Sequence, residues 1–344
     1  MGLWPLAIPV RCHGCDGPSA LALLRCHRLP GGGVGGPAAA ARGRGGCRSG
    51  QAGGLPPGPL AFSTDGYVVQ PLEFPGGDIG SLAVTGTAND LAMVGARPHH
   101  LSVGLILEEG LELALLRRVV ASMAAAAQQC GLTIVTGDTK VVERGKADGV
   151  FITTSGIGVV EAPLPIDPTA IRPGDQLLVS GDLGRHGVAI LAARHGLALV
   201  PPVLSDCAPL WPQVQELLAA GVWIHCLRDL TRGGLASALQ ELADAVGVEL
   251  AIEEVRLPVA EPVARTCDLL GFEPLHLANE GCFVAVVPPQ ACAAARALLE
   301  PRGGAWVGSV RPAGGAGPRV LLRTALGTER LLVPLSGELL PRIC

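Results

Sequence analysis

The stretch Leu60–Pro98, LAFSTDGYVVQPLEFPGGDIGSLAVTGTANDLAMVGARP, carries the first clear pattern of the chain. Its first part, residues 60–72, alternates and is rich in β-branched and aromatic side chains, which predicts a strand. Its second part, residues 78–96, follows a Pro-Gly-Gly turn and predicts a helix of small and apolar residues. The stretch therefore predicts a strand followed directly by a helix.

The same interleaving of strands and helices continues along the chain. Helices are predicted at residues 111–130, 185–195, 210–220, 233–246 and 290–300. Strands are predicted at residues 99–107, 132–142, 149–160, 175–181, 222–229, 248–255, 282–288, 305–310 and 319–324. This order predicts an α/β or α+β fold with helices layered on sheets.

The proline-rich segment 161–174 predicts a boundary between two domains. Residues 1–54 show neither strand nor helix periodicity and predict a low-complexity arm. We therefore divide the chain into this arm, an N-terminal domain at 55–162, a C-terminal α/β domain at 163–333 and a mobile tail at 334–344.

Composition narrows the class of protein. The chain has 344 residues, of which 49% are hydrophobic, and a net charge of −4, so it has no basic surplus for nucleic acid. The sequence contains no run of about 18 uncharged apolar residues, so it predicts no membrane span. The 11 cysteines have no regular spacing, which favours reduced thiols in the cytoplasm.

Some familiar motifs fail on their context. Gly31, Gly33 and Gly36 match a dinucleotide-binding pattern, but no predicted strand precedes them. Cys12-His13-Gly14-Cys15 has the spacing of half a zinc site, without a second pair at the required distance. Neither lysine has the flanking residues of a P-loop.

Four short stretches combine an aspartate with small residues and a turn. Mg²⁺ bound to a nucleotide is held by a few carboxylates and phosphate oxygens, and backbone amides at a turn or helix start suit phosphate. Each stretch alone also fits an ordinary turn, and Asp229 fits a helix cap. Together they predict a nucleotide site without a P-loop, formed by Ser63-Thr64-Asp65, Asn89-Asp90, Gly137-Asp138-Thr139-Lys140 and Arg228-Asp229-Leu230-Thr231-Arg232-Gly233-Gly234.

Glu280 precedes an apolar run, Cys282–Pro288, that reads as a buried strand. A carboxylate at the edge of such a strand is a candidate general base. The alternative is a solvated turn residue.

In this order, these stretches resemble the HypE family, the carbamoyl dehydratases of nickel–iron hydrogenase maturation. The resemblance covers residues 55–344 and is carried above all by GDTKVV, LRDLTRGG, ANEG and the terminal PRIC. The family belongs to a wider group of ATP enzymes that includes aminoimidazole ribonucleotide (AIR) synthetase, thiamine monophosphate kinase and selenophosphate synthetase.

The resemblance implies a two-domain AIR-synthase-like fold in which the N-terminal sheets of two subunits pair into a barrel, with ATP near that interface. It also implies a reaction. A HypF-type carbamoyltransferase loads a carboxamide onto the terminal cysteine, and ATP-dependent dehydration converts it to a thiocyanate. A HypC–HypD complex then accepts the cyano group as a ligand for iron.

The resemblance assigns roles to residues of this chain. Asp65, Asp90 and Asp138 are the candidates for Mg²⁺, and Cys344 carries the substrate. Glu280 is the candidate base, and a neutral Lys140 near the carboxamide or phosphate is the alternative. The nucleotide-binding candidates are Thr64, Asp65, Asp90, Gly137, Asp138, Thr139, Asp229, Thr231 and Arg232.

The chain departs from the family in three places. Residues 18–54 match nothing in it and contain no acid and no lysine, so we hypothesise a pair of compensating frame errors. Gly66 replaces a serine, which would weaken a phosphate or Mg²⁺ contact. Cys282 replaces a lysine, which would leave the pKa of Glu280 higher.

Two other functions remain open at this point. One is a small-molecule kinase or ligase of the same superfamily, and the other is a scaffold for hydrogenase assembly that has lost catalysis. A terminal cysteine favours the dehydratase, because the kinases and ligases act on free substrates and need no thiol.

Overall fold

The computed structural model describes residues 54–315, 317–334 and 343. The arm, and with it nearly all of the segment 18–54 for which we hypothesise frame errors, lies outside these residues. So do Cys344 and most of the predicted tail.

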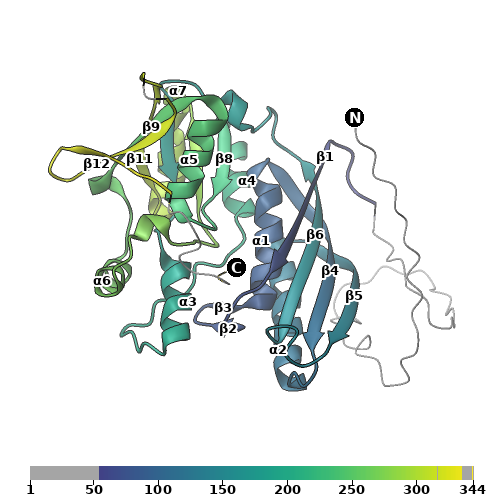
Figure 1. Ribbon diagram of the computed structural model, residues 1–344. Helices are drawn as coiled ribbons and strands as arrows, with labels where there is room; N and C mark the ends of the chain where they lie inside the picture. The colour runs from purple at the N-terminus through teal and green to yellow at the C-terminus, as the bar shows by residue number, and fades with distance from the viewer. Residues whose placement is uncertain (1–53, 316, 335–342, 344) are drawn as a thin grey trace.

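Residues 60–160 form a four-stranded sheet with the strand order β1-β6-β4-β5 (Figure 1). Its neighbours are antiparallel, except that β4 and β5 run parallel. Two helices cover one face of this sheet. The elements are β1 (Leu60–Tyr67), α1 (Ile79–Met93), β4 (Ala96–Glu108), α2 (Leu113–Cys130), β5 (Thr133–Val142) and β6 (Val150–Val160).

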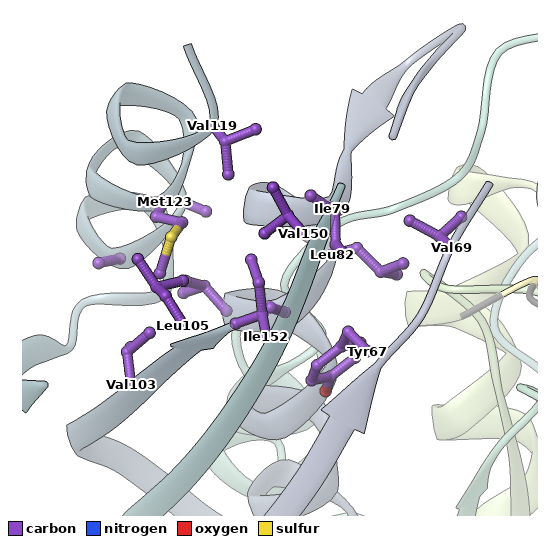
Figure 2. Close-up of a cluster of buried hydrophobic side chains, with 14 of the residues drawn as sticks. Tyr67, Val69, Ile79, Leu82, Val103, Leu105, Val119, Met123, Val150 and Ile152 are labelled. Carbon is purple, nitrogen blue, oxygen red and sulfur yellow. The ribbon is translucent and has the colours of Figure 1, made fainter. Parts of the chain in front are cut away.

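The core of this half lies between the helices and the sheet. Figure 2 shows Ile79 and Leu82 of α1 and Met123 of α2 packed against side chains of the sheet, such as Ile152. Full burial of such a side chain stabilises the fold by roughly 1.5–3 kcal/mol. The core thus consists mostly of aliphatic side chains, as expected for a chain with few aromatic residues.

Helix α1 begins where the sequence predicts. Asp78 is its N-cap and accepts hydrogen bonds from the backbone N–H groups of Gly80 and Ser81 at 2.7 and 2.9 Å. The Ser81 hydroxyl accepts from the N–H of Asp78 at 3.0 Å, which completes a capping box. Most of α1 is buried, because it packs against its own sheet, α2 and elements of the second half. This position puts its C-terminal residues, Asn89 and Asp90, between the two halves.

Among the residues that the structure describes, no helix covers the other face of the four-stranded sheet. Leu60 and Phe62 of β1 are 62% and 67% exposed there, and Ile106 of β4 points the same way. An exposed apolar sheet face of this kind is typical of an interaction surface.

Residues 176–331 form a seven-stranded sheet with the order β13-β12-β9-β11-β7-β10-β8. Only β9 and β12 are parallel neighbours, so the predicted layered fold is of the α+β type. Its strands are β7 (Gln176–Val179), β8 (Cys226–Asp229), β9 (Val248–Glu253), β10 (Phe283–Val287), β11 (Ala305–Pro312), β12 (Arg319–Arg323) and β13 (Glu329–Leu331). Its helices are α3 (Arg185–His195), α4 (Trp211–Ala219), α5 (Gly234–Val246), α6 (Glu261–Leu270) and α7 (Pro289–Leu299).

Strand β10 shows that both faces of this sheet are covered, since all five of its residues are buried. Val284 and Val286 pack into the cluster that contains α5, whereas Phe283, Ala285 and Val287 pack into the cluster that contains α4 and α7. A strand that is buried on both faces reads as a continuous apolar run, as CFVAVVP does.

The structure corrects several of the expected elements. The first strand ends at Tyr67 and not at residue 72, and a short hairpin of β2 (Glu73–Phe74) and β3 (Gly77–Asp78) follows. Helix α6 was not expected from the sequence. Its buried stripe is only Val263, Thr266 and Cys267, which is too short to show as periodicity.

Within the described residues, no helix is long and apolar enough to cross a membrane. The six cysteines whose state is described there are all free thiols.

Candidate functional site

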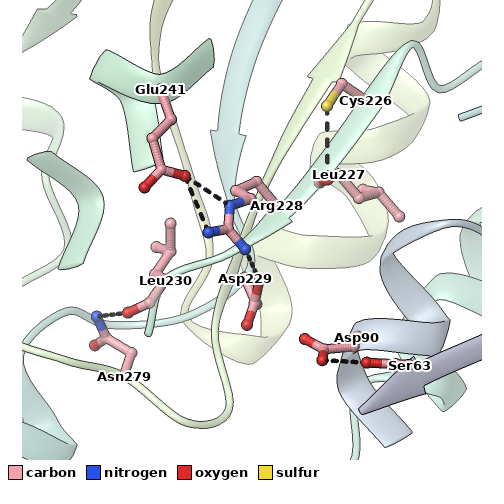
Figure 3. A network of polar contacts seen from close by, with 9 residues as sticks. All are labelled: Ser63, Asp90, Cys226, Leu227, Arg228, Asp229, Leu230, Glu241 and Asn279. Carbon is pink, nitrogen blue, oxygen red and sulfur yellow. Dashed lines mark hydrogen bonds and ion pairs between the residues drawn. The ribbon is translucent and has the colours of Figure 1, made fainter. Parts of the chain in front are cut away.

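Carboxylates from separate parts of the chain lie together where the two halves meet. Asp65 is in β1, Asp90 is in α1, Asp229 ends β8 and Glu280 precedes β10. Figure 3 shows Asp90 and Asp229 approaching each other from these different elements. The cluster thus unites three of the four predicted stretches with the candidate base.

Asp90 of α1 is held by Ser63 of the adjacent strand β1. The hydroxyl of Ser63 donates a hydrogen bond to Asp90 Oδ2 at 2.6 Å. Burial, and to a lesser degree the negative charges of Asp229 and Asp65, raise the pKa of Asp90 to about 6, against the opposing hydrogen bond from Ser63. The carboxylate is therefore poised for a cation that would offset this repulsion.

Asp229 is buried and paired. Arg228 Nη1 donates to Asp229 Oδ1 at 2.7 Å, and the same guanidinium bonds Glu241 of α5 at 3.0 Å (Figure 3). The N-cap of α5 is Gly233 and uses no side-chain hydrogen bond. The alternative that Asp229 simply caps this helix is therefore wrong.

The turn after Asp229 requires glycine. Gly233 and Gly234 have φ values of 75° and 60°, which favour glycine, and a Cβ on Gly234 would lie 2.5 Å from the carbonyl oxygen of Leu277. Thr231 is partly buried and Arg232 exposed on this turn. Both predicted nucleotide residues therefore lie beside the acidic cluster, on a backbone that brings α5 close to residues 275–277.

Glu280 is 3% exposed, which excludes a solvated turn residue. Its Oε1 atom is buried and makes no hydrogen bond. Burial raises its pKa well above the ordinary value, and Asp206, Asp229, Asp65 and Asp90 raise it further. Such a carboxyl takes up a proton readily, as a general base must.

The backbone of Glu280 is fixed from α1. Asn89 Nδ2 donates to the carbonyl oxygens of Glu280 and Ala208, both at 3.1 Å, and Asn89 Oδ1 accepts from the N–H of Leu210 at 2.8 Å. Asn89 therefore has a structural role next to Asp90, the candidate for Mg²⁺ and nucleotide.

Asp206 is a member of the cluster that the sequence did not reveal. It accepts hydrogen bonds from the backbone N–H groups of Glu280 and Gly281, at 3.0 and 3.1 Å. Burial raises its pKa to about 6. A Cβ on Gly281 would lie 1.9 Å from the carbonyl oxygen of Asp206, so only glycine admits this loop. The surrounding sequence has no motif that could have pointed to Asp206.

The remaining stretch, Gly137–Lys140, does not lie in this cluster. Gly137–Lys140 form part of β5 and not a turn between strands. The register puts the side chains of Asp138 and Lys140 on the same face as Thr64, opposite α1 and α2, whereas Thr139 and Asp65 point to the side that these helices cover. Three strand spacings of about 4.8 Å separate β5 from β1, or about 14 Å in all. Within one chain, Asp138 does not join Asp65 and Asp90.

The Lys140 side chain is exposed to solvent. Its Nζ atom pairs with Asp138 Oδ2 at 2.7 Å, and both side chains are 62% exposed. The burial that would make Lys140 a neutral base is not present in the single chain, whereas it is present at Glu280. The structure therefore favours Glu280 as the base.

The two substituted positions differ in their setting. Gly66 has open space where a Cβ would stand, so the usual serine would fit there. The Cys282 thiol is buried against Ser180 and Gly181, in the core of the second sheet. Burial raises the pKa of this thiol to about 12, so it stays neutral.

Among the described residues, no group of three His, Cys, Asp or Glu side chains is arranged to hold a metal ion.

Comparison with known proteins agrees with this arrangement. Residues 53–160 match the family model of the AIR synthase related protein N-terminal domain, and residues 172–319 match that of its C-terminal domain. The matches cover the four-stranded sheet and most of the seven-stranded sheet.

Individual relatives are similar over most of their length. The chain is 54% identical to carbamoyl dehydratase HypE of Rhodobacter capsulatus over 288 residues, 83% of this chain and 84% of the relative. A crystal structure of hydrogenase maturation protein HypE in complex with ATP is 49% identical, with a TM-score of 0.81, over 84% of this chain and 88% of the other. A HypE–HypF complex is 42% identical, with a TM-score of 0.76, over 79% and 89%. The resemblance and the fold class predicted from the sequence are confirmed.

Proposed function

Because this chain belongs to the HypE family of AIR synthase related proteins, we propose that it is an ATP-dependent carbamoyl dehydratase. Its substrate is an S-carboxamide on its own Cys344, and its product is a thiocyanate on the same sulfur. The observation that carries this proposal is Glu280, a buried carboxylate with a free oxygen inside a cluster of acids.

The carboxamide –S–CO–NH₂ and ATP give –S–C≡N, ADP, phosphate and a proton. The carboxamide oxygen first takes the γ-phosphoryl group, which makes it a good leaving group. Two protons then leave nitrogen as the C–O bond breaks and the C≡N bond forms. A carboxylate with a raised pKa at Glu280 suits the removal of a proton from nitrogen.

The residues fit ATP accompanied by Mg²⁺. Mg²⁺ is usually held by one or two carboxylates together with phosphate oxygens and water, which matches Asp65 and Asp90 beside an incoming nucleotide. Bound there, it would neutralise the phosphate charge during transfer. Helix α5 starts close after Asp229, beside the same cluster, and the start of a helix suits phosphate.

The pairing of two subunits belongs to this proposal. The exposed apolar face with Leu60 and Phe62 supports a second copy packed sheet to sheet. Asp138, Thr139 and Lys140 lie about 14 Å across the sheet from their own cluster. In the proposed dimer these residues, with Gly137, contribute to a nucleotide site that one chain does not complete.

The partners and location are proposed on the same basis. The solved HypE–HypF complex supports a HypF-type carbamoyltransferase as the enzyme that loads Cys344. A HypC–HypD complex would accept the cyano group, and the reduced thiols support a cytoplasmic location. We also propose the division into domains at residues 162 and 163.

Mass spectrometry of the C-terminal peptide tests the function. Protein that carries the carboxamide should lose the mass of one water when it is incubated with Mg-ATP, and Cys344→Ala should show no such change. Retention of the carboxamide, with ATP consumed, would refute the dehydratase and favour a kinase or ligase of the superfamily.

A further inference from the structure

Ile343, the residue before Cys344, is bound inside the protein. Its side chain is 6% exposed and packs in the core of the first half. Its carbonyl oxygen accepts a hydrogen bond from His186 Nε2 at 2.8 Å. Phe74 of the β2–β3 hairpin packs edge-on against the His186 ring, with 5.4 Å between centroids. Ile343, directly before Cys344, thus occupies a binding site that includes His186, and we call this site the seat.

The partners of His186 define its tautomer. Burial lowers the pKa of His186 to about 4, so the ring is neutral at physiological pH. A carbonyl oxygen only accepts, so Nε2 carries the proton and Nδ1 accepts from the Ser205 hydroxyl at 2.8 Å. Ser205 Oγ in turn accepts from the N–H of Cys207 at 3.1 Å. A directed chain of hydrogen bonds therefore runs from Cys207 to the Ile343 carbonyl.

The loop that supports His186 also supports the acidic cluster. Asp206 follows Ser205 directly and accepts from the N–H groups of Glu280 and Gly281. The N–H of Ser205 donates to the Pro75 carbonyl at 2.8 Å, which ties the loop to the hairpin. One short segment thus joins the seat of Ile343 to the candidate base.

We propose that His186 is a positioning residue that seats the main chain before Cys344, and that Ser205 couples this seat to the loop of Asp206 beside Glu280. The inference rests on the proposed function, because it gives the seat the task of presenting the substrate-bearing end of the chain. Recognition is through a backbone carbonyl and an apolar side chain. The seat therefore accepts the free thiol, the carboxamide and the thiocyanate alike.

Two substitutions separate the two ring nitrogens. His186→Asn keeps an acceptor near Nδ1 for Ser205 but has no donor to Ile343. His186→Gln keeps an amide N–H near Nε2. The matched control is His225→Asn, since His225 is also a buried histidine but bonds Asp175, at 2.7 Å, away from the seat.

The first readout is the rate at which iodoacetamide alkylates Cys344 in the full chain, measured on the C-terminal peptide. Loss of a hydrogen bond of ordinary net strength should raise this rate about fivefold in His186→Asn. His186→Gln and His225→Asn should stay near the wild-type rate. Equal rates in all four proteins would overturn the seat, as would equal acceleration by Asn and Gln at His186.

The second readout is single-turnover dehydration of protein that carries the carboxamide. His186→Asn should be slowed about tenfold with the KM for ATP unchanged, because only substrate alignment is lost. Faster alkylation with an unchanged dehydration rate would overturn the positioning role. If wild-type protein fails to dehydrate, the proposed function fails, but the alkylation rates still decide whether the seat exists.

Discussion

Replacing Asp90 with asparagine removes a charge that folding places in an unfavourable setting. Burial first, and then the charges of Asp229 and Asp65, raise the pKa of Asp90 from its ordinary value of 3.8 to about 6. Asparagine has the same size and keeps an oxygen for the Ser63 hydroxyl. Its amide also faces Asp229 (Figure 3), so the packing should change little.

The magnitude follows from the pKa. A rise from 3.8 to about 6 corresponds to about 3 kcal/mol, since one pKa unit is about 1.4 kcal/mol. Because the folded state holds this proton more tightly than the unfolded chain, the contribution of Asp90 to folding stability is greatest below pH about 4 and is lost as the pH rises through about 6. Wild-type protein should lose up to about 3 kcal/mol from this group over that range, and Asp90→Asn should not.

Urea unfolding without nucleotide, at pH about 4 and about 8, measures this difference. The two proteins should have similar midpoints at the lower pH, and Asp90→Asn should be the more stable at the higher pH. Asp268→Asn, a change of an exposed aspartate in α6, is the control and should follow wild type at both. A difference between Asp90→Asn and wild type that does not widen with pH would refute the account of Asp90.

Three further predictions concern the base, its loop and the sheet face. Glu280→Gln should retain ATP binding, measured by calorimetry, but lower the single-turnover rate by about 100-fold or more; the wild-type rate should rise with pH above the ordinary carboxyl range, since the pKa of Glu280 is raised. Gly281→Ala should displace Asp206, because the new Cβ would lie 1.9 Å from the carbonyl oxygen of Asp206. This variant should also lower the single-turnover rate, while circular dichroism should show that it still folds. Phe62→Glu should shift the protein to monomers in analytical ultracentrifugation, because it puts a charge on the exposed apolar face; an unchanged dimer would contradict pairing through this face.

Local patterns predicted most of the elements. The helix at 185–195 was predicted at the bounds that α3 has, and α5 begins one residue after its predicted start. Helix α5 is amphipathic, and in both helices a glycine follows directly after the last residue and marks the end. The β2–β3 hairpin was missed because two-residue strands have no periodicity to detect. Pro75, Gly76 and Gly77 predict only a turn there.

The sequence by itself determined the family, the order of elements and most members of the acidic cluster, because each of these is written in contiguous residues. Only the tertiary structure decided which members meet. It separated Thr64 from Asp65 because neighbouring side chains of a strand point to opposite faces, and Asp138 from Asp90 because Asp138 lies on the far edge strand and on the face opposite α1. It added Asp206 and the seat of Ile343, because both depend on loops that return from distant parts of the chain. Contacts of that kind are set by the packing of the two halves and leave no local pattern in the sequence.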